Sequence, residues 1–329
     1  MIRQMTADEH ADRRRLGIID VGTNSAHLLI GEVGPGGRFR VILERHDPIR
    51  LGDGGLAAGA LSLAAMRRAM AVLRRYAVLL KRRTIDEVAA VATSAVREAR
   101  NGRAFARQVR SQLGLPLRII SGREEGRLIY LGVRSLSRAR GPVLLVAIGG
   151  GSAQVAQGEG ARLRYSASLP LGCARLAERF IRHDPPRPEE LDALRAYARA
   201  AWAPVARALR RRHRRVALGS SSTIGQLMRM IGARRHGRCP ARARPLTVSR
   251  RSLREAVAQL AGPTASERRR LPVTDPRHRD LLLATGMALL TWMEGCGVSV
   301  VRYAPGSLRE GLLATYSGSM WHGPTRQRR

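Results

Sequence analysis

The feature that most constrains the fold is an internal repeat of a strand, a glycine-rich turn and a second strand. The first copy, LGIIDVGTNSAHLLIGEV, covers residues 16–33, and the second, VLLVAIGGGSAQVAQGE, covers residues 143–159. At an offset of 127 residues the copies align without a gap and share five identities. Gly22, Ser25, Ala26, Gly31 and Glu32 match Gly149, Ser152, Ala153, Gly158 and Glu159. Because the identities include turn residues, duplication of one α/β unit is the economical explanation.

Strands and helices alternate around the two copies, which is typical of the α/β class. The first half predicts a strand at 38–44, an amphipathic helix at 63–82, a strand at 87–93, a helix at 94–113, a strand at 117–120 and a helix at 123–135. The second half predicts a helix at 187–212, a strand at 216–219 leading into another helix, a loop at 234–246, helices at 249–261 and 277–294, a strand at 298–303 and a helix from Ser307.

Length and composition limit the class of protein. With 329 residues, 44% of them hydrophobic, the chain is long and apolar enough for two domains with a core each. Cys173, Cys239 and Cys296 lack CxxC spacing, so neither a disulfide framework nor a zinc site is indicated, and a reducing cytoplasm is expected. The N-terminus lacks the apolar region of a signal peptide. The most apolar run, 281–293, is shorter than the roughly 20 residues of a membrane span, so we expect a buried helix and no membrane association.

The net charge of +34 has two interpretations, which the sequence leaves open. A charge of this size attracts polyanions and makes their binding depend steeply on salt. Alternatively, the charge is compositional, because nearly every basic residue is arginine, as a GC-rich coding bias would produce. Aromatic residues are scarce at 4%, and no helix-turn-helix or zinc signature is present, so we expect nucleic acid to bind only non-specifically.

The two glycine-rich turns are the candidate binding elements. In the first, Asp20 ends a strand and Gly22–Ser25 follows, which places several backbone N–H groups and two hydroxyls around one point. Such a turn can hold phosphate oxygens. An ordinary hairpin would explain either turn alone. Two matched turns, Gly22–Ser25 and Gly149–Ser152, instead predict that duplicated lobes hold one phosphate chain from both sides of a cleft.

Seven segments carry a resemblance to a known family: IIDVGTNSAHLLI (18–30), ATSAVREARN (92–101), IISGREEGRLIYLGV (119–133), AIGGGSAQV (147–155), SLPLGCARLAERF (168–180), LGSSSTIGQL (218–227) and GSLREGLL (306–313). In order, they resemble the blocks of the exopolyphosphatase and guanosine pentaphosphate phosphatase (Ppx/GppA) family, in its short form without an HD domain. The resemblance implies two duplicated ribonuclease-H-like lobes of the actin, sugar-kinase and chaperone-ATPase superfamily. We expect a tail at 1–15, lobe I at 16–122 plus about 304–329, and lobe II at 123–303.

The resemblance also implies an activity and a set of residues. The activity is hydrolysis of the terminal phosphate of inorganic polyphosphate, or of the 5′ phosphate of guanosine pentaphosphate, usually with magnesium. Glu125 matches the catalytic base, which would deprotonate water for in-line attack. Asp20 matches a catalytic and metal-binding acid. The implied phosphate-binding residues are Gly22, Thr23, Asn24, Ser25, Ser94, Arg97, Gly149, Gly150, Gly151 and Ser152. Homodimers are common among relatives.

The second turn departs from the family pattern. The family has an acid on each side of this turn, whereas this chain has Ala147 and Gln154. The internal repeat indicates the same loss, because Ala147 aligns with Asp20. Magnesium prefers hard oxygen ligands, commonly one or two carboxylates plus phosphate oxygens, so we expect a weakened metal site and impaired catalysis. The alternative is a polyphosphate- or alarmone-binding protein that is catalytically weak or inactive.

Overall fold

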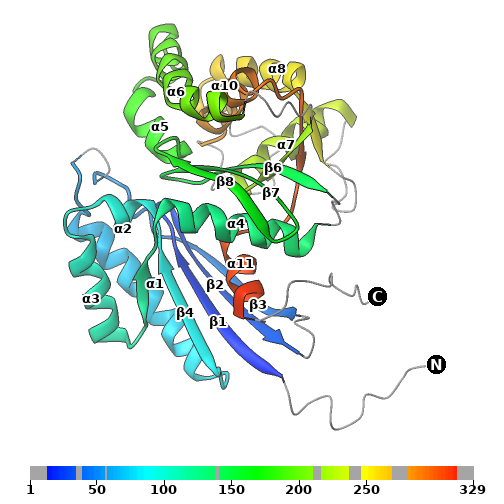
Figure 1. The fold of residues 1–329 in the computed structure, drawn as a ribbon. Coiled ribbons are helices and arrows are strands. Elements are labelled where there is room, and N and C mark those ends of the chain that lie inside the picture. Colours follow the sequence, from blue (N-terminus) through cyan, green and yellow to red (C-terminus); the bar gives the residue numbers. More distant parts are fainter. Residues whose placement is uncertain are drawn as a thin grey trace. The chain divides into compact units, whose positions relative to one another are not determined.

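The computed structural model describes residues 13–34, 39–55, 58–137, 141–209, 216–236, 246–268 and 281–316. The chain divides into two compact units, which are considered separately below (Figure 1). Unit 1 comprises Met1–Arg138 and Gly306–Arg329, and unit 2 comprises Ala139–Pro305. Of the expected tail at 1–15, residues 1–12 lie outside the described residues, and Arg14 and Arg15 belong to the first strand instead.

Unit 1 is built on a five-stranded mixed sheet in the order β3-β2-β1-β4-β5. The strands are β1 (Arg14–Val21), β2 (Ser25–Val33), β3 (Phe39–Pro48), β4 (Glu87–Ala92) and β5 (Leu117–Ile119). The first three form an antiparallel meander, and β1, β4 and β5 run parallel. Central β1 carries the nearly continuous apolar run of a strand that is covered on both faces.

The helices of unit 1 cover both faces of this sheet. They are α1 (Leu63–Lys81), α2 (Ser94–Glu98), α3 (Gly102–Leu113), α4 (Gly122–Leu136) and α11 (Leu308–Tyr316). Helix α1 begins where the Ser62 side chain accepts a hydrogen bond from the Ala65 N–H. Its apolar side and that of α3 form a core with alternate side chains of the sheet, such as Ile19 and Val21. Helix α11 packs against β1 and β2.

The predicted helix at 94–113 is two helices, so this prediction is wrong over 99–101. Ala99 takes an extended conformation and ends α2. Asn101 then forms two hydrogen bonds with the Leu61 backbone, accepting from its N–H at 2.8 Å and donating to its carbonyl at 2.9 Å. A Cβ on Gly102 would lie 1.9 Å from the Val96 carbonyl oxygen, so the close turn between the helices requires glycine.

The expected lobe boundary at 122/123 also needs correction, because α4 belongs to unit 1. Helix α4 packs against α11 at a contact that only glycines permit. A Cβ on Gly132 would lie 1.9 Å from the Ser307 carbonyl oxygen, and a Cβ on Gly311 would lie 1.9 Å from that of Leu128. The two backbones therefore touch, which fixes both helices to the same unit.

Unit 2 repeats the strand pattern of unit 1 and adds one edge strand. Its sheet has the order β10-β11-β9-β6-β7-β8. The strands are β6 (Pro142–Ile148), β7 (Ala153–Glu159), β8 (Arg162–Leu169), β9 (Val216–Ser220), β10 (Thr247–Ser249) and β11 (Val300–Tyr303). Strands β6, β7 and β8 form the meander, and β6, β9 and β11 run parallel.

A matching irregularity supports the duplication. The register shifts between Ile30 and Gly31 where β2 pairs with β3, and between Gln157 and Gly158 where β7 pairs with β8. These positions are related by the same offset of 127 residues as the glycine turns. Since a bulge bends and twists a strand at a defined point, the two meanders share their local distortion as well as their order. The predicted α/β class and the internal repeat are confirmed.

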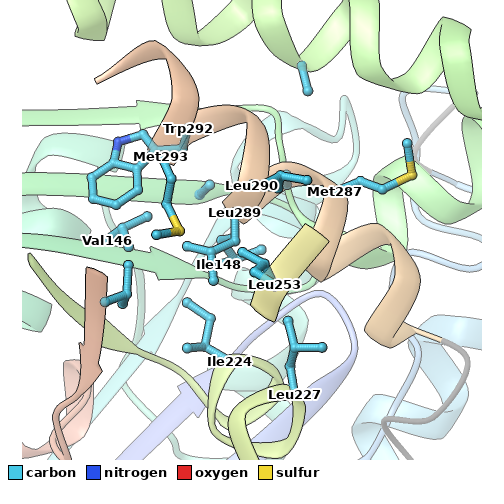
Figure 2. Close-up of a cluster of buried hydrophobic side chains, with 14 of the residues drawn as sticks. Val146, Ile148, Ile224, Leu227, Leu253, Met287, Leu289, Leu290, Trp292 and Met293 are labelled. Atoms are coloured by element: carbon cyan, nitrogen blue, oxygen red, sulfur yellow. The ribbon is translucent and has the colours of Figure 1, made fainter. Parts of the chain in front are cut away.

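The core of unit 2 surrounds one almost completely buried helix. Its helices are α5 (Cys173–Phe180), α6 (Pro188–Leu209), α7 (Ser222–His236), α8 (Arg250–Ala261), α9 (Ala265–Arg268) and α10 (Leu282–Gly295). Every residue of α10 from Leu282 to Met293 is buried. Figure 2 shows its Met287, Leu289, Leu290, Trp292 and Met293 among the apolar side chains of this core. The Trp202 indole N–H of α6 donates to the Ala288 carbonyl at 3.1 Å, which joins α6 to α10. Among the described residues, no helix is long and apolar enough to cross a membrane.

Some boundaries predicted for unit 2 differ from the structure or lie outside the described residues. Helix α7 continues to His236, so the predicted loop at 234–246 begins later than expected. Residues 237–245 of that loop, residues 210–212 of the predicted helix at 187–212 and residues 277–280 of the predicted helix at 277–294 lie outside the described residues.

Candidate functional site

In unit 1, the candidate residues gather at one edge of the sheet. Because β1, β4 and β5 are parallel, their carboxyl ends lie at the same edge. The glycine turn follows β1, Ser94 and Arg97 lie on α2 just after β4, and Glu125 lies in the first turn of α4 after β5. Ligands of open α/β sheets bind at this edge, where helix N-termini also favour anions.

The first turn, Gly22–Ser25, is held through its carbonyl groups. The Gly22 N–H donates to the Ser25 carbonyl at 3.0 Å and closes the turn. The Asn24 carbonyl accepts from the N–H groups of Ile49 and Arg50, and the Thr23 carbonyl accepts from Gly52. Within the described part of unit 1, the N–H groups of Thr23 and Asn24 have no acceptor, and the buried Thr23 hydroxyl has no partner. The turn is thus rigid and presents donors, as an anion-binding turn requires.

Asp20 lies at the base of this turn, and its charge is only partly compensated. Its Oδ1 atom is buried and has no hydrogen-bond partner among the described residues. Burial raises the pKa of Asp20 from 3.8 to about 6, while the Arg309 guanidinium lowers it and the Glu310 carboxylate raises it further. A buried oxygen without a partner is expected where a ligand supplies the missing contact.

Arg97 and Glu125 form an ion pair. An Arg97 Nη1 donates to Glu125 Oε2 at 2.9 Å and to the Ile120 carbonyl at 3.2 Å. The Glu125 side chain is 9% exposed, so the pair is largely shielded from water. Neighbouring Glu124 instead forms two hydrogen bonds with the exposed Arg118 guanidinium. As expected from helical geometry, only one of the two glutamates faces the site.

Ser94 is buried next to Arg97 on α2, and its hydroxyl donates to Glu98 Oε1 at 2.7 Å. This proton is therefore directed to a carboxylate within its own helix. A phosphate contact of Ser94 stays a prediction, and it would require the hydroxyl to turn away from Glu98.

In unit 2, the second turn is held in a similar way. The Gly149 N–H donates to the Ser152 carbonyl at 2.9 Å, as Gly22 does to Ser25. The first N–H groups of α5 bind the turn carbonyls: Cys173 donates to Gly149, and Ala174 and Arg175 donate to Gly150. Arg175 Nε also donates to the Gly151 carbonyl at 2.7 Å. The turn carbonyls thus point toward α5, and the Gly150 and Gly151 N–H groups lack an acceptor within the described residues.

The positions of the missing acids are filled by a neutral network. Ala147 lies directly opposite Gln154, as Asp20 lies opposite His27 in unit 1. The Gln154 amide donates to the hydroxyl oxygens of Ser152 at 2.7 Å and Ser168 at 3.3 Å. Gln154 is only 3% exposed, so it is a buried structural partner of the turn.

Two cations of the sites were not identified as site residues from the sequence, namely Arg175 and Arg309. Both lie in the first turn of a helix, Arg175 in α5 after β8 and Arg309 in α11 after β11, within the quoted segments SLPLGCARLAERF and GSLREGLL. Arg175 is bonded to its turn, and Arg309 acts on Asp20 electrostatically. Their place within the segments that resemble the family is the signal that could have indicated both.

Magnesium fits the two turns unequally. In unit 1, the Asp20 Oδ1 atom could serve as one hard oxygen ligand, with phosphate oxygens and water completing the shell. In unit 2, Ala147 and Gln154 leave the second turn without a carboxylate. Among the described residues, no group of three or more histidine, cysteine or acidic side chains is arranged to hold a metal ion. The residues therefore fit a weakly held metal at the first turn and none at the second.

Comparison with known proteins decides the family. A sequence model of the Ppx/GppA phosphatase family matches residues 29–319. The chain belongs to the Ppx/GppA phosphatase family. An exopolyphosphatase 1 of Mycobacterium tuberculosis is 30% identical to this Ppx/GppA protein over 301 residues, which cover 91% of this chain and 87% of the relative. An exopolyphosphatase structure from Cytophaga hutchinsonii has a TM-score of 0.84 at 26% identity, covering 93% of this chain and 98% of its own.

Other structures agree on the fold. The Ppx/GppA family member of Aquifex aeolicus has a TM-score of 0.75 at 26% identity and covers 92% of this chain and 97% of its own. A nucleoside triphosphate hydrolase structure from Neospora caninum, at 11% identity, has a TM-score of 0.51 and covers 94% and 93%. The duplicated α/β fold expected from the resemblance is confirmed.

Proposed function

We propose that this Ppx/GppA protein hydrolyses the terminal phosphoanhydride bond of inorganic polyphosphate, with guanosine pentaphosphate as the second candidate substrate. The observation that carries the proposal is the shielded Arg97–Glu125 ion pair at the sheet edge where the first glycine turn presents its donors. Relatives at 30% identity named as exopolyphosphatases support the choice of polyphosphate.

In this proposal, some residues of unit 1 bind the terminal phosphoryl group and another activates the attacking water. The N–H groups of Thr23 and Asn24 and the guanidinium of Arg97 bind oxygens of the terminal phosphoryl group. Glu125 orients a water molecule and accepts its proton as the water oxygen bonds to phosphorus. The bond from phosphorus to the bridging oxygen breaks, and the shortened chain leaves with the electron pair. Since Arg97 and Glu125 are already paired, the base is held in place before substrate arrives.

Magnesium would supply charge neutralisation of the phosphate oxygens, with Asp20 as the protein ligand in unit 1. We propose that the loss of acids at Ala147 and Gln154 lowers turnover relative to a family member that has them. We also propose that the second turn, Gly149–Ser152, binds phosphoryl groups. That one phosphate chain contacts both turns stays a prediction.

Phosphate release from long-chain polyphosphate with magnesium or manganese tests the proposal, using Glu125→Gln against Glu124→Gln. The two variants make the same chemical change one residue apart, but only Glu125 pairs with Arg97. We expect Glu125→Gln to lower the rate roughly 10²- to 10⁴-fold and Glu124→Gln to leave it nearly unchanged. Equal rates in the wild type and Glu125→Gln would contradict the proposal. Parallel assays with guanosine pentaphosphate and ATP rank the substrates.

The second candidate function is binding of polyphosphate or an alarmone without efficient hydrolysis. The neutral network around Gln154 favours it, because a donor-rich turn without an acid suits anion binding better than metal-assisted chemistry. Calorimetry with each ligand decides this alternative. An affinity weaker than millimolar for every polyphosphorylated ligand would contradict it.

A further inference from the structure

Gln154 donates hydrogen bonds at a position beside the second glycine turn where a carboxylate could only accept them. Its Nε2 group donates to Ser152 Oγ and to Ser168 Oγ, so both hydroxyl oxygens act as acceptors. A serine hydroxyl has one proton to donate, and here that proton is directed away from Gln154. A carboxylate at this position could only accept, and it would draw the same proton toward itself. The amide therefore holds both hydroxyl oxygens as acceptors and adds no negative charge beside the turn.

The connections around the turn reinforce this polarity. Residues 149–152, 170–172 and 221, which follow β6, β8 and β9, contain no aspartate or glutamate. Ala147 removes the remaining acid position of the repeat. Arg175, bonded to the Gly151 carbonyl, adds a positive charge at the same turn. In the described part of unit 2, the turn thus combines backbone donors, hydroxyl groups and a guanidinium.

We propose that Gln154 makes the second turn a site for metal-free phosphate chains, which binds phosphoryl oxygens directly and discriminates against their magnesium complexes. This inference rests on the proposed phosphate binding by the second turn. It adds that the turn selects the metal-free form of the phosphate chain over the magnesium-bound form. The N–H groups of Gly150 and Gly151 supply the contacts. A chelated magnesium ion cancels the charge that attracts these donors and finds no hard oxygen ligand at the turn.

The test is calorimetric titration of the full chain with inorganic tripolyphosphate, in EDTA and in excess magnesium. All proteins carry Glu125→Gln, which removes hydrolysis of the probe. We expect tighter binding in EDTA than in magnesium. The substitution Gln154→Glu should weaken binding in EDTA by roughly 10-fold or more, because it replaces a neutral amide by a carboxylate that repels the phosphate chain. In that variant, magnesium should strengthen binding, which reverses the sign of its effect.

Two further variants make the result decisive. Ala193→Glu adds the same charge at an exposed position of α6 and should leave both affinities unchanged. Gln154→Met keeps the volume but cannot donate to Ser152, so it should weaken binding in EDTA without creating a preference for magnesium. Tighter wild-type binding in magnesium, or the same sign of the magnesium effect in Gln154→Glu, would overturn the inference. Because the readout is binding, it is independent of whether phosphate release fails in the activity assay.

Discussion

Asp20 should make the active protein less stable than an inactive variant. Burial raises its pKa from 3.8 to about 6, so the folded state disfavours the charged carboxylate. The folded chain binds more protons than the unfolded chain between these values, and stability therefore falls as pH rises through this window. Each pKa unit corresponds to about 1.4 kcal/mol, so the penalty from Asp20 grows from about 0.5 kcal/mol at pH 4 to about 3 kcal/mol above pH 7.

Asp20→Asn removes this penalty while keeping the size of the side chain. We expect the variant to gain about 3 kcal/mol of unfolding free energy at pH 8 and little at pH 4. At roughly 2–4 °C per kcal/mol for units of this size, its melting temperature should rise by roughly 6–12 °C at pH 8. Phosphate release should fall sharply, because the variant also loses the negative charge that would hold a metal.

The assay is thermal unfolding in EDTA between pH 4 and pH 8. Asp53→Asn serves as the control, because the Asp53 side chain is exposed and its one ion pair among the described residues is a long one, with Arg68 at 3.5 Å. Its substitution should change stability by less than about 0.5 kcal/mol at any pH. A difference between wild type and Asp20→Asn that does not grow with pH would refute the reasoning, as would a variant less stable than wild type at pH 8.

Two further predictions concern packing and metal use. Gly311→Ala should destabilise the protein by roughly 1–3 kcal/mol or more in urea unfolding, because its Cβ would lie 1.9 Å from the Leu128 carbonyl oxygen. Gly295→Ala, whose Cβ would meet only an ordinary contact at 3.8 Å, should have no such effect, and equal losses would contradict the packing argument. Ala147→Asp combined with Gln154→Glu should raise magnesium-dependent phosphate release. An unchanged rate would mean that the missing acids do not limit turnover.

The sequence was most informative where local chemistry and the repeat agreed. Matched turns at Gly22 and Gly149 predicted the duplicated units, because a strand, turn and strand of this type can be recognised from residue types alone. The ion-pair partners of individual side chains were harder to predict from the sequence. That Glu125 pairs with Arg97 and Glu124 with Arg118 depends on the direction of α4 and on the neighbours that it meets. Helical spacing showed only that the two glutamates diverge.

The remaining differences arise from contacts distant in sequence. The break after α2 depends on Asn101 reaching the backbone of Leu61, which no pattern within 94–113 reveals. The lobe boundary was misplaced because α4 is held by Gly132 and Gly311, which are far apart along the chain. Likewise, the Asp20 Oδ1 atom is buried without a hydrogen-bond partner among the described residues because several elements pack around it. Residue type suggested its role, but only the fold shows its burial.

The close crossing of α4 and α11 has a consequence for synthesis on the ribosome. Unit 2 is continuous, so it can finish folding once Pro305 has left the exit tunnel. Unit 1 is translated first but lacks its last helix until Leu308–Tyr316 emerges, and meanwhile the surface of α4 around Gly132 stays uncovered. The part of the chain that is made first should therefore be the last to complete its native structure, and a nascent chain stalled before residue 308 should keep unit 1 open to proteases and chaperones.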